Sequence, residues 1–322
     1  MLPKAALALA LAACSAPADM PDSDDAWFEG LPLPKPRLEP GVTALGQRMI
    51  VLGGFTEDLV ITREVDAFDV FANRWEPVQP APVAWTHANL GSAAATLYLL
   101  GGLEGPNFIP RGDSFALDLD IAGAQWRALE PIPPGLERGA AAVVVSPPHI
   151  FLLGGATLTG SVATCIDYNL SSNTWRRLPD LPSPRSHAAA MRRPDGTLII
   201  AGGLAGLGSS TALDEVLELP LEGVAWRPRT RMPTRRGGCA YGNVFNQLVC
   251  AGGEVNGAAV PVTESYDPYS DQWTSLPNML RPRAGTQGAV ISGRLYVPGG
   301  SASLRFEPTD TVFVFQLLEA LQ

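Results

Sequence analysis

The sequence is poor in charge and nearly devoid of lysine. Charged residues make up 17% of its 322 residues, and only Lys4 and Lys35 among the 23 basic residues are lysines. A globular domain usually carries about a quarter charged residues. The formal net charge is −9, and no basic tract is present that could neutralise a run of phosphates. These absences exclude nucleic acid as an expected partner.

Long apolar stretches with the 3.6-residue period of a helix are also missing. Short apolar runs that end in glycine take their place, such as LYLLGG (97–102), IFLLGG (150–155) and TLIIAGG (197–203). The chain contains 33 glycines and 30 prolines, which indicates many turns, while 46% of its residues are hydrophobic, as in folded domains. This composition predicts an all-β fold.

The first twenty residues, MLPKAALALALAACSAPADM, have the pattern of an export signal. One early lysine precedes an apolar run of about nine residues, too short to span a bilayer. LAAC, ending at Cys14, resembles the bacterial lipobox, so we expect residues 1–13 to be a signal peptide and Cys14 to be lipidated. The alternative is an ordinary secretory signal beside a coincidental cysteine. Residues 14–25 would then be a disordered tether, which predicts lipid anchoring in the cell envelope, facing the periplasm or the exterior.

Glycine doublets recur at an almost constant interval along the rest of the chain. Successive doublets lie 47 to 53 residues apart, at 53/54, 101/102, 154/155, 202/203, 252/253 and 299/300. Glycine has no Cβ, so a doublet permits positive φ and the close approach of neighbouring backbone. A period of this length is typical of repeat architectures whose units bury their faces by stacking.

Two further landmarks keep the same register. Each of the first five doublets is followed, 21 to 25 residues later, by a tryptophan, at Trp75, Trp126, Trp175, Trp226 and Trp273. An arginine lies 16 or 17 residues before every doublet but the second, at Arg37, Arg138, Arg185, Arg236 and Arg283, and Trp85 replaces it in the second repeat. Each unit therefore predicts four short strands, A to D, with strand A after the arginine, strand B before the doublet and strand D at the tryptophan.

The stretch WFEGLPLPKPR (27–37) supplies the tryptophan that the last repeat lacks. Trp27 and Arg37 are ten residues apart, as Trp175 and Arg185 are in WRRLPDLPSPR. Prolines are tolerated in an edge strand, so this proline-rich segment need not be a linker. We expect it to pair beside residues 310–316 as the outer strand of the last sheet and to close a ring.

Together the doublets, the Tyr/Phe-Asp/Asn pairs before the tryptophans and the LPxLPxPR stretch resemble kelch repeats across residues 27–316. The resemblance implies a six-bladed kelch β-propeller over residues 26–322, closed by the N-terminal strand. The kelch family first of all binds ligands, on the face that its D-to-A and B-to-C loops form around the central channel, and the fold by itself predicts no reaction.

The repeated arginines are the first candidate ligand residues, because they lie at the D-to-A position. Five guanidinium groups around one mouth, at Arg37, Arg138, Arg185, Arg236 and Arg283, would suit an acidic protein or carbohydrate ligand. They could instead pair with carbonyls and carboxylates inside each blade. Trp85, which interrupts the series, would stack on a sugar ring or side chain at the mouth, or simply fill a gap in the packing.

Glu254 is the second candidate, since it is the only ionisable residue directly after a doublet. Its GGE setting resembles that of the catalytic glutamate in bacterial sialic-acid epimerases, which are exported six-bladed kelch propellers. A carboxyl there could move a proton between a sugar ring oxygen and water. A solvated loop glutamate is the other interpretation.

Histidines and cysteines offer little for a metal site. A copper radical oxidase of kelch type needs two histidines and two tyrosines at one metal, whereas His87 and His187 fall in blades 2 and 4, which are not neighbours, and His149 lies in a turn. We therefore expect structural histidines, no metal and no cofactor. Cys239 and Cys250 fall on one hairpin, as a disulfide or as two buried thiols, and no zinc spacing is present.

The sequence thus predicts a monomeric cell-envelope binding module, held to the membrane only by its lipid anchor. Its ligand would be a protein or a carbohydrate, acidic in character, bound at the channel mouth. The alternative is a carbohydrate-active enzyme, a sugar epimerase or mutarotase that uses Glu254.

Overall fold

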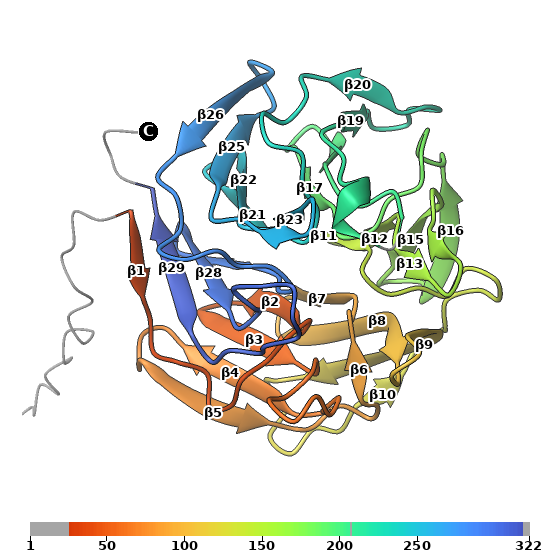
Figure 1. Cartoon of the computed structure of the whole chain (residues 1–322). Coiled ribbons are helices and arrows are strands. Elements are labelled where there is room, and N and C mark those ends of the chain that lie inside the picture. Colours follow the sequence, from red (N-terminus) through yellow and green to blue (C-terminus); the bar gives the residue numbers. More distant parts are fainter. Residues whose placement is uncertain (1–25, 207, 318–322) are drawn as a thin grey trace, which may run out of the picture.

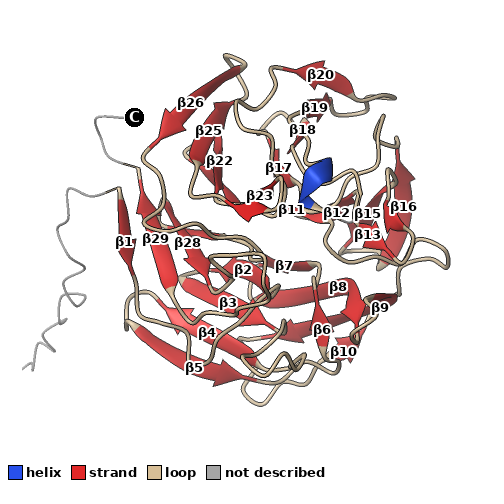
Figure 2. Ribbon diagram, in the orientation of Figure 1, coloured by secondary structure: helices blue, strands red, loops and turns tan. Residues whose placement is uncertain are grey.

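The computed structural model describes residues 26–206 and 208–317, in which six antiparallel sheets stand radially around a central channel (Figure 1). Within those residues the one helix is a short 3-10 turn, η1 (Ser209–Thr211), shown in blue in Figure 2. The predicted fold class, an all-β six-bladed propeller, is confirmed. Residues 1–25 lie outside the described part, and with them the predicted signal peptide, Cys14 and tether. No helix in the described residues is long and apolar enough to cross a membrane.

Each sheet is one blade, with strand A at the channel and strand D at the rim. Blade 1 consists of β2 (Gly41–Leu45), β3 (Arg48–Leu52), β4 (Val65–Asp69) and β5 (Arg74–Val78). Blade 2 consists of β6 (Trp85–Thr86), β7 (Leu90–Ala93), β8 (Thr96–Glu104), β9 (Ile109–Asp118) and β10 (Arg127–Ala128). Blade 3 consists of β11 (Ala142–Ser146), β12 (His149–Leu153), β15 (Cys165–Asn169) and β16 (Thr174–Leu178).

Blades 4 to 6 follow the same order. Blade 4 consists of β17 (Ala189–Arg192), β18 (Leu198–Ala201), β19 (Val216–Leu219) and β20 (Arg227–Arg229). Blade 5 consists of β21 (Ala240–Val244), β22 (Gln247–Ala251), β25 (Thr263–Asp267) and β26 (Gln272–Leu276). Blade 6 consists of β27 (Ala289–Ile291), β28 (Arg294–Pro298), β29 (Val312–Gln316) and, as its strand D, β1 (Trp27–Glu29). Two B-to-C connections carry small hairpins, β13 (Ala156–Thr157) with β14 (Gly160–Ser161), and β23 (Glu254–Val255) with β24 (Ala258–Ala259).

The N-terminal strand closes the ring as predicted. β1 pairs antiparallel with β29, with Trp27 opposite Phe315, and Figure 1 shows these two strands side by side. The indole Nε1 of Trp27 donates to the carbonyl oxygen of Pro277 in blade 5. The other five repeat tryptophans each donate in the same way to a carbonyl of the preceding blade, so Trp27 is the sixth member of the series.

Hydrophobic cores lie between the blades, one for each adjacent pair. At the closing interface Trp27, Phe313 and Phe315 pack with Val244 and Val249 of blade 5. The remaining clusters fill the other five interfaces. Because both faces of every sheet are apolar, no blade can bury its surface alone, and the closed ring buries all of them.

The glycine doublets are needed where one blade contacts the next. Gly154 has a φ of 64°, and a Cβ there would lie 2.2 Å from the carbonyl oxygen of Arg185 in blade 4. The next residue, Gly155, donates its N–H to that same oxygen at 2.8 Å. The approach excludes a side chain, which explains why the doublets recur with the period of the blades.

Candidate functional site

A ring of six residues surrounds the channel at its loop-lined mouth, one from each blade and each two positions after the arginine position. This inner ring consists of Glu39, His87, Ala140, His187, Gly238 and Gly285. All six have φ between 50° and 69°. Five of their N–H groups donate to the carbonyl of the ring residue in the preceding blade, at 2.7 to 3.0 Å. The backbone of the inner ring is therefore held rigidly in place.

Three of these positions carry polar side chains in a conformation that favours glycine. Gly238 and Gly285 adopt a positive φ without cost, whereas Glu39, His87 and His187 bring a Cβ close to the following carbonyl. Non-glycine residues with positive φ are uncommon, and strain of this kind gathers at functional sites. Ala140 shares this conformation, so Glu39, His87 and His187 are candidates because they combine it with polar side chains.

Glu39, His87 and His187 converge in the channel although they come from blades 1, 2 and 4. The two imidazole rings are nearly perpendicular, with centroids 5.1 Å apart. Nε2 of His87 lies 3.5 Å from a carboxylate oxygen of Glu39. One potential ligand atom from each of the three residues lies within 4.8 Å of the other two. The three side chains therefore form a compact polar cluster.

Each histidine is oriented by the hydroxyl of the residue before it. Nδ1 of His87 lies 3.0 Å from Oγ1 of Thr86, and that hydroxyl donates to the carbonyl oxygen of Glu39 at 3.2 Å. The hydroxyl oxygen must then accept from Nδ1–H of His87, which leaves Nε2 as an unprotonated acceptor. In blade 4 Nδ1 of His187 lies 2.9 Å from Oγ of Ser186, which accepts a hydrogen bond from Ser161, so the Ser186 hydroxyl is free to donate to that nitrogen.

The cluster forms part of the wall of a cavity of about 350 Å³ at the mouth. This mouth cavity is lined by apolar side chains that include Leu103, Leu204 and Phe306, and by Glu254 at the start of β23. Phe108 extends the aromatic part of the wall, with its ring 5.6 Å from that of His87. Figure 2 shows β23 and η1 over the central part of the ring. An apolar wall with a few converging polar groups is the usual character of a small-molecule site.

Burial sets the charges in the mouth cavity. It lowers the pKa of both His87 and His187 to about 4, so both imidazoles are neutral near pH 7. It also raises the pKa of Glu39, against the opposing effect of His187. Burial, with a smaller contribution from the charge of Glu39, raises the pKa of Glu254 to about 7. Two carboxyl groups and two neutral imidazoles thus share one partly desolvated space.

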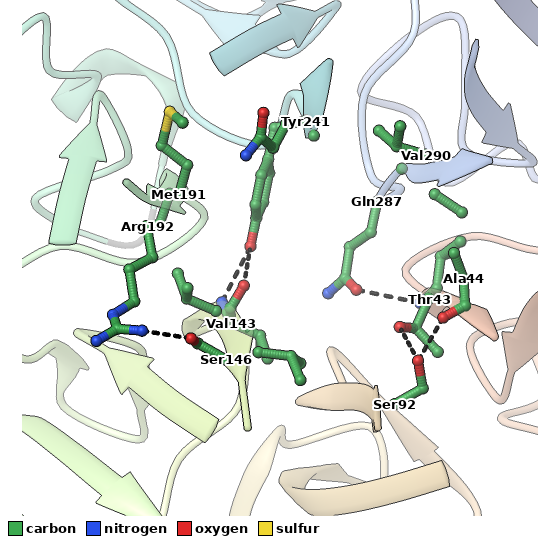
Figure 3. Close-up of a pocket in the computed structure, with 18 of the residues that line it drawn as sticks. Thr43, Ala44, Ser92, Val143, Ser146, Met191, Arg192, Tyr241, Gln287 and Val290 are labelled. Atoms are coloured by element: carbon green, nitrogen blue, oxygen red, sulfur yellow. Dashed lines mark hydrogen bonds between the residues drawn. The ribbon is translucent and has the colours of Figure 1, made fainter. Parts of the chain in front are cut away.

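A second, larger cavity of about 520 Å³ lies at the other end of the channel, where strands A turn into strands B (Figure 3). Its polar groups bond to one another: the hydroxyl of Tyr241 contacts N and O of Val143, and Nη1 of Arg192 contacts Ser146. Tyr241 also helps to line a small space of about 30 Å³ below the Glu39–His87–His187 cluster. Because its polar groups are already paired, this end is the weaker candidate for a binding site.

The arginines do not form the collar that the sequence suggested. All five are buried, with at most 3% of their surface exposed, so none is available to a ligand at the mouth. Arg138, Arg185 and Arg236 bond to groups at strands B and C of their own blades, as Arg236 does to Cys250 and Glu264. Arg37 pairs with Glu64 and Asp66, and the guanidinium of Arg283 lies over the ring of Phe313. Arg138 donates to the carbonyls of Gly154 and Thr164. The assignment of Arg37, Arg138, Arg185, Arg236 and Arg283 to ligand binding was wrong, because burial directs them into the blade.

Trp85 does not face the channel mouth. Its side chain is fully buried in the core between blades 1 and 2, where its ring lies 6.2 Å from that of Phe115. The indole fills the space that an arginine occupies in the other blades. The second of the two readings of Trp85, a filled gap, is therefore the one that the structure supports.

Glu254 lies where the sequence placed it, in the B-to-C loop of blade 5 and against the mouth cavity. The two histidines were judged too far apart, which is wrong, since the channel is narrow at the inner ring and side chains of non-adjacent blades meet across it. Counting two positions beyond each arginine position, that of Trp85 included, gives Glu39, His87 and His187 among the six ring residues. His149, at the start of β12, bonds to Asp167 at 2.9 Å and plays a structural part.

The three cysteines within residues 26–206 and 208–317 are buried free thiols, so Cys239 and Cys250 form no disulfide. A hydrogen bond between Cys239 and Cys250 lowers the pKa of Cys239 and raises the pKa of Cys250. Cys165 is buried in the core between blades 3 and 4, as expected of a strand C core residue.

A closed ring of six radial antiparallel sheets, five of four strands and one of five, with a cavity at its mouth defines a β-propeller of the binding or enzymatic class. Residues 235–280, which form most of blade 5, match the family model described as "Kelch motif". The chain belongs to the kelch-repeat β-propeller family.

Three known proteins illustrate this relationship. The chain is 30% identical over 300 residues to kelch-like protein terF of Aspergillus terreus, covering 87% of this chain and 64% of that protein. It is 29% identical to beta-scruin of Limulus polyphemus over 74% of this chain and 25% of that protein. The chain thus spans less than two thirds of either relative. The solved structure of YjhT superposes with a TM-score of 0.76, covering 90% of this chain and 97% of that chain at 13% identity, a likeness of fold.

Proposed function

We propose that this protein is a ligand-binding kelch propeller of the cell envelope and that the mouth cavity is its binding site. The observation that carries the proposal is the convergence of Glu39, His87, His187 and Glu254 on one cavity of about 350 Å³. Kelch propellers commonly bind partners through the loops of this face. The export signal and Cys14 support display from a lipid anchor, as expected from the sequence.

The wall of the mouth cavity favours a hydroxylated ligand over an acidic one. Arginines are absent from its described lining, and Glu39 and Glu254 contribute carboxyl groups that accept hydrogen bonds. Phe108 and Phe306 offer aromatic surface on which the apolar face of a sugar ring can pack. A carbohydrate terminus fits this combination. The acidic character expected from the sequence depended on the arginine collar and is therefore no longer part of the proposal.

Binding can be tested by NMR titration of the intact protein with a panel of neutral and acidic monosaccharides. Phe306→Ala is expected to weaken binding of the neutral sugars by about tenfold or more, because it removes a stacking surface at the cavity. Phe245→Ala is the matched control, since Phe245 is similarly exposed but lies in the turn between β21 and β22. Equal affinities of the two variants, or binding only of acidic sugars, would contradict the proposal.

A second candidate function is sugar mutarotation, favoured by the position of Glu254. Its carboxyl group lines the same cavity as the neutral imidazoles of His87 and His187, and Nε2 of His87 is an unprotonated acceptor. Opening a sugar ring requires an acid at the ring oxygen and a base at the anomeric hydroxyl, and the raised pKa of Glu254 suits it to exchange a proton near neutral pH.

This candidate is tested by following the interconversion of N-acetylneuraminate anomers by NMR. Acceleration that is lost in Glu254→Gln and retained in Glu222→Gln, a change in an exposed turn, would support the enzyme. If the unaltered protein did not accelerate the interconversion, the mutarotase function would be excluded, whereas the binding proposal would be unaffected.

A further inference from the structure

We propose that Glu39, His87 and His187 form a binding site for a divalent transition-metal ion such as Zn²⁺. The proposal goes beyond ligand binding in the mouth cavity and does not depend on it, because the three side chains suffice. The sequence predicts no metal, since it places the two histidines in blades that are not neighbours.

The donor set is the first argument. Two imidazole nitrogens and one carboxylate oxygen are a common set for Zn²⁺ and for other divalent first-row ions. One ligand atom from each residue already lies within 4.8 Å of the others. Around a tetrahedral Zn²⁺, with bonds of about 2.0 to 2.1 Å, such atoms are separated by roughly 3.3 Å. Small rotations of the three side chains would close the remaining distance.

The hydroxyl groups of Thr86 and Ser186, which contact Nδ1 of the two histidines, also fit a metal site. A histidine that binds metal usually donates its other ring N–H to an oxygen, which fixes the tautomer and the direction of the ring. Thr86 holds Nδ1 of His87 in this way, and Oγ of Ser186 lies 2.9 Å from Nδ1 of His187, where it would accept from that nitrogen when Nε2 binds the ion. Both contacts leave Nε2 for the ion.

The backbone is the third argument. His87 and Glu39 are joined by an inner-ring hydrogen bond of 3.0 Å, and His187 donates to Ala140 at 3.0 Å in the same ring. Positive φ holds all three residues in a conformation that glycine takes more readily. A site on such a fixed frame is preorganised, so little order has to be gained on binding.

The site would keep open coordination positions. Three protein ligands leave at least one position of a tetrahedral ion unfilled, as in zinc sites that bind substrate or water. Here that position faces the mouth cavity, because all three ligands line it. The ion could then hold an oxygen atom of whatever ligand occupies the cavity.

The experiment is a titration of the intact protein, purified without a histidine tag and stripped with chelator, with Zn²⁺ by calorimetry and with Co²⁺ by visible absorption. We expect one ion per chain. Absorption bands typical of four- or five-coordinate Co²⁺ should appear and be displaced by Zn²⁺. No organic ligand is present, so the outcome is independent of sugar binding.

His87→Gly and His187→Gly are the decisive variants, because Gly238 and Gly285 occupy the same position in blades 5 and 6. Glycine relieves the positive-φ strain, so both variants are expected to fold while losing at least about 100-fold in metal affinity. Thr86→Val and Ser186→Ala keep the ligands and should lose about 10- to 100-fold. His149→Gln is the control and should bind as the unaltered protein does.

Two results would overturn the proposal. One is a failure of the unaltered protein to bind a single equivalent of Zn²⁺ or Co²⁺. The other is equal affinity in the unaltered protein and in the folded double variant of His87→Gly with His187→Gly. The melting temperature and near-ultraviolet circular dichroism of every variant, measured without metal, separate loss of the site from loss of the fold.

Discussion

The indole Nε1 of Trp27 donates a hydrogen bond to the carbonyl oxygen of Pro277 at 2.9 Å, although 250 residues of chain separate them. The same bond, from a repeat tryptophan to the preceding blade, recurs at the five other blade interfaces. The contact of Trp27 with blade 5 therefore completes the ring, and the cohesion of the propeller depends on a segment near the beginning of the chain.

Loss of this segment is expected to destabilise the whole propeller. Trp27→Ala removes a side chain that is 3% exposed and should cost about 3 to 5 kcal/mol, and deletion of residues 26–37 should cost more, because it also exposes β29. Chemical denaturation measures both effects. Deletion of residues 15–25 is the control, and an unchanged unfolding midpoint in all three proteins would show that the ring closure is not needed.

Replacement of Arg236 should act on stability rather than on binding. Arg236→Ala leaves the carboxylate of Glu264, whose side chain is 3% exposed, without its partner, which typically costs about 3 to 5 kcal/mol. Arg231→Ala removes an exposed arginine paired with Asp214 and should cost less than about 1 kcal/mol. Urea unfolding compares the two. If Arg236→Ala lowered the free energy of unfolding only slightly but abolished ligand binding, the arginines would be ligand-binding residues after all.

Stability should depend on the protonation of Glu254. Its pKa is about 7 in the folded protein against an ordinary 4.5, so the folded state binds more protons between these values. The free energy of unfolding is therefore highest, as far as Glu254 is concerned, below pH 4.5, and it falls as the pH rises from 4.5 through 7.

Glu254→Gln removes this loss, because the amide stays neutral. At about pH 8 the variant should be more stable by about 1 to 2 kcal/mol, a value reduced for the solvent that reaches the carboxyl group, and it should match the unaltered protein near pH 4. Thermal melts at the two pH values measure the difference. If Glu254→Gln raised the stability equally at both pH values, the negative charge of Glu254 would not be the cause of the gain.

Two glycine-to-alanine substitutions can separate the cost of positive φ from the cost of a steric clash between blades. Gly154→Ala places a Cβ where the carbonyl oxygen of Arg185 would be 2.2 Å away, so blades 3 and 4 must separate. Gly46→Ala, at a φ of 58° and with nothing within 4 Å, meets only the backbone strain of about 1 to 2 kcal/mol. The unfolding free energy of Gly154→Ala should fall by clearly more than that of Gly46→Ala. Similar losses would mean that blade contact does not select glycine.

The sequence by itself determined the repeat, the number of blades and the closure by Trp27. These follow from local requirements, a glycine where backbones touch and a tryptophan where sheets diverge, which recur at the same spacing in every unit. Such requirements can be read without coordinates, because each depends on the residue and its immediate neighbours. The position of Glu254 after its doublet is of the same kind.

Only the tertiary structure decided which side chains face the mouth cavity. The arginine position is regular in sequence, but its side chain turns into the blade, where carbonyls and carboxylates satisfy it. Two positions later, positive φ directs His87 and His187 into the channel, and their rings come within 5.1 Å of each other only because six blades close around a narrow axis. That meeting is a property of the ring, which no spacing within a single repeat can encode.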